Sequence, residues 1–172
     1  TTSDLQDILQ RGAHAAADLG HGHHADLAFL ESNGLLETQE AELSQRALER
    51  GMKSLGTLGS GNHFLELQTV GSVVDEATAA AWGLYEDQVV AMIHSGSRGL
   101  GHQVCTDHVR GLEATYKQQE GMWVNEKWGY ALPDRQLASA PVYSVEGQAY
   151  LDSMNAAANF AFANRAVLAE RL

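Results

Sequence analysis

The fold is decided by the stretch GTLGSGNHFLELQ, residues 56–68, in which a glycine-rich loop runs directly into an asparagine, a histidine and an alternation of apolar and polar residues. Three glycines allow the loop to take positive φ angles and to approach a ligand closely. Successive N–H groups in such a loop can form a nest for an anion. From Phe64 onward the pattern predicts a short, largely buried strand. His63 therefore lies where a loop meets a strand, which suits a metal or phosphate site.

A second stretch, VVAMIH at residues 89–94, predicts another buried strand that ends at a histidine. A glycine-rich turn with two serines and Arg98 follows it. If the two strands pair antiparallel, the start of one lies beside the end of the other, and His63 and His94 converge. In a parallel pair they would be separated by about five residues of strand, or roughly 16 Å. We predict the antiparallel case, with both histidines, an asparagine, a carboxylate and the arginine on one rim.

These side chains suit a metal and a phosphate. His63 and His94 are neutral imidazole donors for Mn, Zn, Fe or Co, and Asn62 and Glu66 offer oxygens for a ribose, a water or a nucleotide. Glu66 is an odd number of residues from His63, so the two face opposite sides of a regular strand. Both reach one ligand only if the strand is bulged or if His63 precedes it.

Arg98 is predicted to hold a phosphate by two parallel hydrogen bonds, with Ser95, Ser97 and backbone N–H groups assisting. The alternative is a surface salt bridge, which the neighbouring glycines disfavour. A helix predicted over residues 102–116 points its amino end back at this turn and adds a dipole that favours an anion.

Composition indicates one soluble domain. The chain has 172 residues, of which 44% are hydrophobic and 19% charged, and its apolar runs are too short to span a membrane. A single cysteine fits the reducing cytoplasm. We expect this residue, Cys105, to be a buried core thiol on the helix rather than a ligand or nucleophile. The net charge of −11 opposes RNA binding except at a local basic patch near Arg98.

The predicted fold class is α+β, with a mixed or antiparallel sheet flanked by helices and a long alanine-rich helix at the carboxyl end. Ser3, Thr38 and Ser144 are the predicted N-caps of three helices, and Gly51 is predicted to end the second of these. Three histidines at positions 21, 23 and 24 suggest metal binding, but we favour a solvated loop. The predicted helices span residues 3–19, 26–32, 38–50, 76–82, 102–116 and 144–172; residues 67–74 form two strands or one bulged strand, and residues 120–133 a loop.

Several segments resemble the signature segments of the RtcB-type RNA ligases, the tRNA-splicing ligases. The resemblance covers most of the chain after Gly51, and the first fifty residues match loosely. It implies an RtcB-like fold in which residues 1–172 are a single partial domain, the central portion of the ligase domain with both ends absent. It rests on GTLGSGNHFLELQ (56–68), MIHSGSRGLGHQVCTDH (92–108), LPDRQLA (132–138), AP (140–141), EGQAYL (146–151), MNAAANFA (154–161) and ANR (163–165).

The resemblance also implies a GTP- and Mn²⁺-dependent ligase that joins RNA 3′-phosphate or 2′,3′-cyclic phosphate ends to 5′-hydroxyl ends in tRNA splicing or RNA repair. In this family a histidine is guanylylated, the guanylate passes to the 3′-phosphate, and the 5′-hydroxyl then attacks. His63 and His94 match the manganese ligands, and Arg98 matches a residue near the RNA phosphate. The guanylate-binding segment is matched by Asn62, His63, Phe64, Leu65 and Glu66.

Three family features have no counterpart in this sequence. An early Asp/Cys metal motif is missing, with Cys105 at the wrong place to replace it, and a later histidine ligand and the guanylylated histidine lie beyond residue 172. We therefore expect that the 172 residues alone are not guanylylated and need the remaining ligase segments. The alternatives are a non-catalytic paralogue or fragment that binds a nucleotide or metal weakly, and a metal-dependent phosphohydrolase.

Overall fold

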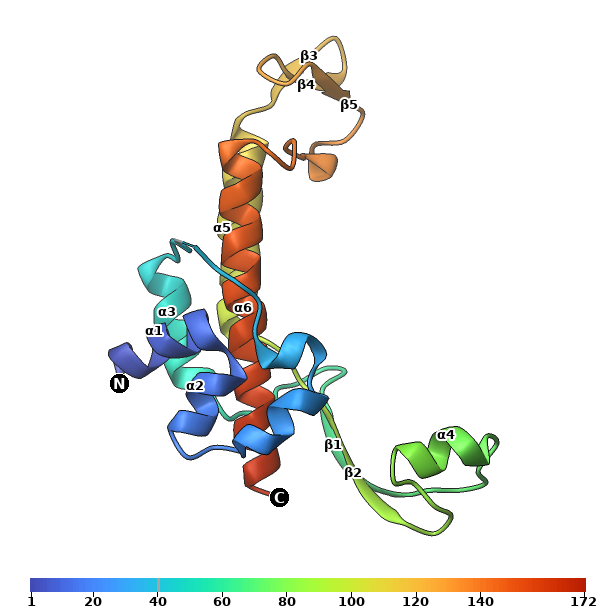
Figure 1. Cartoon of the computed structure of the whole chain (residues 1–172). Coiled ribbons are helices and arrows are strands. Elements are labelled where there is room, and N and C mark those ends of the chain that lie inside the picture. Colours follow the sequence, from blue (N-terminus) through green and yellow to red (C-terminus); the bar gives the residue numbers. More distant parts are fainter. Residues whose placement is uncertain (40) are drawn as a thin grey trace. The chain divides into compact units, whose positions relative to one another are not determined.

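The computed structural model describes residues 1–39 and 41–172, which form two compact units (Figure 1). The first unit consists of Thr1–Thr57 and Gly96–Leu172, and the second of Leu58–Ser95. Small antiparallel sheets, flanking helices and a long carboxyl-terminal helix confirm the predicted fold class. Among the described residues, no helix combines the length and the apolar character needed to cross a membrane.

The first unit is built around two helices that run side by side, α5 (Arg98–Ala114) and α6 (Val145–Glu170) (Figure 1). Ser144 caps α6 as predicted, because its hydroxyl accepts a hydrogen bond from Gly147 N at 3.0 Å. Alanines along α6 allow neighbouring helices to approach closely, and four of them, Ala156, Ala157, Ala161 and Ala163, are buried. The main core consists of Leu5, Ile8, Leu9, Ala15, Ala16, Ala47, Leu100, Val104, Ala156, Ala157, Phe160 and Ala163.

The predicted amino-terminal helix is divided at Gly12 into α1 (Thr2–Arg11) and α2 (Ala13–Asp18). Gly12 has φ 56° and ψ −129°, a conformation that glycine adopts readily. The cap is Thr1 rather than Ser3, because the Thr1 hydroxyl accepts a hydrogen bond from Asp4 N at 3.3 Å. The segment predicted over 26–32 forms two 3₁₀ turns, His24–Phe29 and Glu31–Gly34.

The next helix, α3 (Gln45–Ser54), begins later than predicted. Ser44 rather than Thr38 is its cap, since its hydroxyl accepts from Ala47 N at 3.2 Å and donates to Asp107 Oδ2 at 2.6 Å. This hydrogen bond holds α3 against α5 and lowers the pKa of the Asp107 carboxyl. Gly51 does not end the helix but lies within it, where an added Cβ would be 2.7 Å from Leu100 Cδ1. Residue 40 of the predicted range lies outside the described residues.

The prediction of a loop over residues 120–133 was wrong. Strands β3 (Lys117–Gln119), β4 (Met122–Asn125) and β5 (Tyr130–Leu132) form an antiparallel sheet in that order, followed by a 3₁₀ turn at Arg135–Leu137. The first two strands are joined by residues 120–121, which both have positive φ, as in the type I′ turn that hairpins favour.

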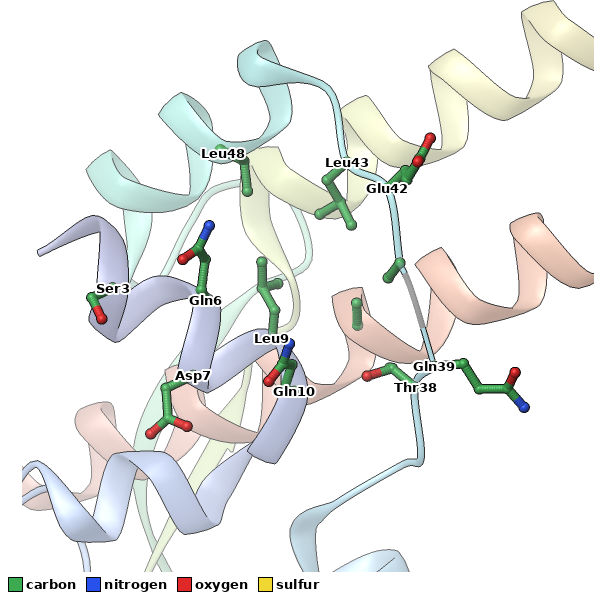
Figure 2. A pocket seen from close by; sticks show the side chains of 12 residues that line it. Ser3, Gln6, Asp7, Leu9, Gln10, Thr38, Gln39, Glu42, Leu43 and Leu48 are labelled. Carbon is green, nitrogen blue, oxygen red and sulfur yellow. The ribbon is translucent and has the colours of Figure 1, made fainter.

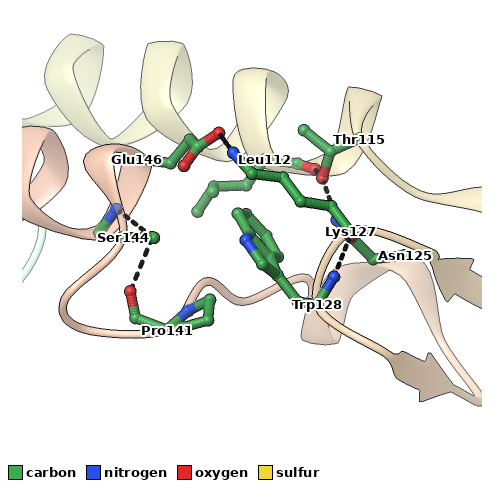
Figure 3. Close-up of polar contacts among 9 residues, drawn as sticks. Leu112, Thr115, Asn125, Lys127, Trp128, Pro141, Ser144 and Glu146 are labelled. Atoms are coloured by element: carbon green, nitrogen blue, oxygen red, sulfur yellow. Dashed lines mark hydrogen bonds and ion pairs between the residues drawn. The ribbon is translucent and has the colours of Figure 1, made fainter.

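Asn125, only 1% exposed, anchors this sheet to the end of α5 (Figure 3). Its amide donates to Thr115 Oγ1 at 2.7 Å and accepts from Trp128 N at 3.1 Å. An ion pair of 2.5 Å between Lys127 and Glu146 links the same region to the first turn of α6.

In the second unit, β1 (Phe64–Thr69) pairs with β2 (Val89–His94) in the predicted antiparallel sense, and α4 (Glu76–Ala81) follows the cap Asp75. The predicted second strand or bulge over 67–74 is not formed, because β1 ends at residue 69 and Gly71 lies in the loop after it. The strands are also less buried than predicted: no apolar side chain of Leu58–Ser95 is fully buried, and Leu67 is 73% exposed.

Cys105 is exposed, which corrects the prediction of a core thiol. The buried face of α5 is formed by Leu100, Gln103 and Val104, and Val109 is 40% exposed. Each helical residue turns about 100° from the last, so position 105 points away from the face that residues 100 and 104 share.

Replacing Gly12→Ala should destabilise the first unit more than Gly20→Ala does. Both glycines have positive φ, but an added Cβ at Gly12 would meet the Gly34 carbonyl oxygen, whereas nothing lies within 4 Å at Gly20. We expect a loss of about 1–2 kcal/mol from conformation alone at either position, plus about 1–3 kcal/mol from displacing Gly34. Urea unfolding of the two variants measures the difference, and equal losses would contradict the close approach.

Candidate metal and phosphate site

The two histidines converge as the sequence predicts. The rings of His63 and His94 have centroids 6.0 Å apart and stand nearly perpendicular, at 88°. The strand register places Phe64 directly opposite His94, and these two rings also meet edge to face with centroids 5.3 Å apart. Metal–nitrogen bonds of about 2.0–2.1 Å can link two imidazoles at such a spacing.

His63 lies immediately before β1, which is one of the two arrangements predicted for it. Its Nδ1 is 3.0 Å from the carbonyl oxygen of Ser60. A carbonyl can only accept, so Nδ1 carries the proton and Nε2 keeps its lone pair in the neutral ring. The glycine-rich loop thus favours the tautomer of His63 in which Nε2 is open to a metal ion.

Glu66 lies on the same face of the ribbon as Phe64 and His94. It is opposite Met92, two residues along β1 from Phe64 or about 6.6 Å, and its carboxylate accepts from Gln68 Nε2 at 2.9 Å. Leu65 is opposite Ile93 and points to the other face. Of the segment 62–66, the side chains facing His94 are therefore those of Phe64 and Glu66, and Asn62 is exposed in the preceding turn.

The histidine pair alone does not complete a metal site. Across residues 1–39 and 41–172, no group of three or more His, Cys, Asp or Glu side chains is arranged to hold an ion. Two neutral imidazoles fit Mn²⁺, Zn²⁺, Fe²⁺ or Co²⁺, and the remaining positions require water, substrate oxygens or other protein groups. In the loop of His21, His23 and His24, His24 Nε2 is 3.1 Å from Asp18 Oδ1.

Arg98 begins α5 in the first unit, with φ 51° in the left-handed region. Its Nε donates to Thr57 Oγ1 at 3.2 Å. Ser97 is the N-cap residue but makes no capping hydrogen bond with its side chain. Ser95 is buried, and its hydroxyl donates to the Leu58 carbonyl at 2.7 Å. The histidine pair belongs to the other unit, so a rim shared by these histidines and Arg98 stays a prediction.

Sequence reasoning missed Asn164, a fully buried residue of α6. Its Oδ1 accepts from Gly56 N at 2.7 Å and from Thr57 N at 3.2 Å. Its Nδ2 donates to the carbonyls of Thr57 and Gly96, each at 3.2 Å. A polar residue inside the alanine-rich helix was the available signal, because a buried amide must find hydrogen-bonding partners.

The first unit has hollows of its own. One of about 850 Å³ lies beside α1, with amides, hydroxyls and carboxylates around the apolar side chains of Leu9, Leu43 and Leu48 (Figure 2). Another of about 650 Å³ lies between α5 and α6, and small, apolar and hydroxyl-bearing residues line it together with His102 and Cys105.

The comparisons identify relatives along the whole chain. The family model described as tRNA-splicing ligase RtcB matches residues 1–172. The RNA-splicing ligase RtcB of Mycobacterium tuberculosis is 52% identical over 167 residues, which are 96% of this chain and 37% of the relative. The tRNA-splicing ligases RtcB of Thermococcus kodakarensis and Pyrococcus furiosus are each 48% identical over 96% of this chain, but over 33% and 16% of the relatives. The chain thus spans little more than a third of these proteins at most.

The hydrogen bond to Ser60 predicts the tautomer of His63. Two-bond ¹H–¹⁵N correlation spectra at neutral pH should show a protonated Nδ1 and an unprotonated Nε2 for this ring. His14 is an internal comparison, because its Nε2 faces the Asn33 carbonyl at 3.0 Å and should carry the proton instead. A protonated Nε2 on His63 would contradict its assignment as a preoriented ligand.

Proposed function

We propose that this chain, which belongs to the RtcB family of tRNA-splicing ligases, is the central part of an RNA ligase that uses GTP and Mn²⁺. It would join RNA 3′-phosphate or 2′,3′-cyclic phosphate ends to 5′-hydroxyl ends, with the remaining ligase segments as necessary partners. The observation that carries this proposal is the convergence of His63 and His94 at one end of the β1–β2 ribbon. We propose a cytoplasmic location, because a chain with a single cysteine fits a reducing compartment.

His63 and His94 are the residues that would hold the metal. A bound divalent ion neutralises charge on phosphate oxygens and aligns the groups of an in-line transfer. His63 is oriented for this by Ser60, and Phe64 supports His94 through its ring contact. Beside His63, Asn62 and Glu66 are the polar side chains of the proposed guanylate-binding segment 62–66.

The charge of the second unit supports a metal-dependent role. Residues 58–95 contain five carboxylates and no lysine or arginine. Such a surface attracts cations and repels the phosphates of an RNA strand. RNA would therefore meet this unit through a metal ion, and its phosphates would need cationic groups from outside it.

Arg98 is the proposed phosphate-binding group. Its Nε is engaged by Thr57, so the two Nη groups are the donors for phosphate oxygens. A guanidinium presents such donors in a fixed plane, whereas a lysine ammonium does not.

Labelled GTP and Mn²⁺, added to the intact protein, should leave a covalent guanylate on the chain. His63→Ala and His94→Ala should each abolish the label because each removes half of the histidine pair. His23→Ala, in the exposed loop of the first unit, is the matched control and should retain it. Phosphate release from cyclic-phosphate RNA without GTP would indicate a phosphohydrolase, and no label at any metal concentration would indicate a non-catalytic paralogue.

Arg98→Lys should reduce ligation of 3′-phosphate RNA by about 10–100-fold, because a bidentate charge-assisted contact of a few kcal/mol becomes a single point contact. The effect should appear mainly in KM for the RNA, with guanylylation little changed. Arg135→Lys is the control, since this arginine pairs with Glu113 at 3.4 Å and stacks on Trp123 in the distal sheet. Unchanged ligation by Arg98→Lys would refute the phosphate role.

A further inference from the structure

We propose that Asn164 is a positioning residue that fixes the turn carrying Arg98 and both ends of the segment 58–95. Its consequence for ligation rests on the proposed function of Arg98. The anchoring itself stands on geometry and can be tested separately.

The Asn164 amide joins three parts of the chain that are far apart in sequence. Its oxygen accepts from two successive N–H groups, those of Gly56 at 2.7 Å and Thr57 at 3.2 Å. Its nitrogen donates to the carbonyls of Thr57 and Gly96 at 3.2 Å each. These acceptors and donors lie where the chain leaves the first unit and where it returns. A single buried side chain is therefore hydrogen-bonded both to Gly56–Thr57, where the chain leaves the first unit, and to Gly96, where it re-enters.

Thr57 carries this anchoring on to Arg98. Its backbone is bound by Asn164 through both N–H and C=O, and its hydroxyl donates to the Ser54 carbonyl at 2.5 Å. Because that bond uses the only hydroxyl proton, the oxygen lone pairs of Thr57 face Arg98 Nε, which donates to them at 3.2 Å. The guanidinium is thus oriented by an acceptor that cannot easily rotate.

The backbone at Arg98 also needs support. Its φ of 51° is unfavourable for a residue with a Cβ, and strained residues persist only where their surroundings hold them. Gly96, two residues earlier, is fixed by Asn164. Gly101 completes the turn, because a Cβ there would overlap the Ser97 hydroxyl. The strained turn is therefore hydrogen-bonded to Asn164 at Gly96 and closely packed at Gly101.

Asn159 provides a natural control on the same helix. It is equally buried, at 0% exposure, and uses the same amide chemistry: its Nδ2 donates to the carbonyls of Leu9 and Leu36, and its Oδ1 accepts from Leu36 N at 2.8 Å. Its partners belong to the amino-terminal region rather than to the Arg98 turn. A change at Asn159 reports the cost of disturbing a buried amide without disturbing that turn.

The test compares Asn164→Asp with Asn159→Asp in the intact protein. An aspartate keeps the accepting oxygens but loses the donors to Thr57 and Gly96 and places a charge against their carbonyls. Hydrogen exchange should accelerate at residues 56–57 and 96–98 in Asn164→Asp only, and near Leu36 in Asn159→Asp only. Equal acceleration at residues 56–57 in both variants would overturn the anchoring, whether or not the protein ligates RNA.

The catalytic consequence is tested by kinetics. Asn164→Asp should lower kcat/KM for 3′-phosphate RNA at least tenfold at a temperature where both variants are folded, and Asn159→Asp less than threefold. If Asn164 acts through Arg98, adding Asn164→Asp to Arg98→Lys should cause little further loss. Full additivity, or equal losses in the two asparagine variants, would show a role in stability alone.

Thr57→Val keeps the proposal testable if Asn164→Asp does not fold. Thr57 is exposed, so this variant removes the acceptor of Arg98 Nε while leaving the buried amide in place. Like Arg98→Lys, it should raise KM for the RNA. In a chain that already carries Arg98→Lys, it should have no further effect. An unchanged KM would overturn the link through Thr57. Arg98→Lys that ligates normally would instead refute the phosphate role, leaving the exchange result to decide the anchoring.

Discussion

The buried amide of Asn164 is the interaction on which the segment Gly56–Thr57 and the turn before Arg98 most depend. Backbone N–H and C=O groups that leave water must find partners, and four of them, at Gly56, Thr57 and Gly96, find theirs in this one side chain. Breaking it would leave the buried N–H of Gly56 and three part-buried backbone groups without this partner at once, which costs more than losing a contact between apolar groups. The start of the glycine-rich loop and the turn before Arg98 are therefore both hydrogen-bonded to the same residue of α6.

The sequence predicted the strand pairing and the proximity of the two histidines better than the boundaries of elements. The convergence of His63 and His94 follows from a strand that begins after one histidine and a second that ends at the other, because antiparallel pairing leaves little choice. The exposure of Cys105 and the identity of the α3 cap could not be predicted in this way. Both depend on which distant segments pack against the helices α5 and α3. Ser44 prevails over Thr38 because Asp107, 63 residues away, accepts its hydroxyl proton.

Residues 120–133 show a different limit. Short strands of three or four residues carry too little periodicity to distinguish them from a loop, and two positive φ angles at Glu120 and Gly121 determine the hairpin. Asn164 and Asn125 were missed for a related reason. A buried amide is recognisable in sequence as a polar residue in apolar surroundings, but the groups it binds are known only once distant segments are brought together.

The second unit has little buried apolar interior to hold the two histidines in place. A two-stranded ribbon is marginal by itself, and no apolar side chain between Leu58 and Ser95 is fully buried. Its strand ladder places Phe64 directly opposite His94. A divalent ion bound to both histidine rings would tie β1 to β2, and binding energy would then appear as stability of the ribbon. Metal binding and ordering of the histidine pair would in this way be one equilibrium, and the five carboxylates of residues 58–95, without a lysine or arginine, would favour the bound state.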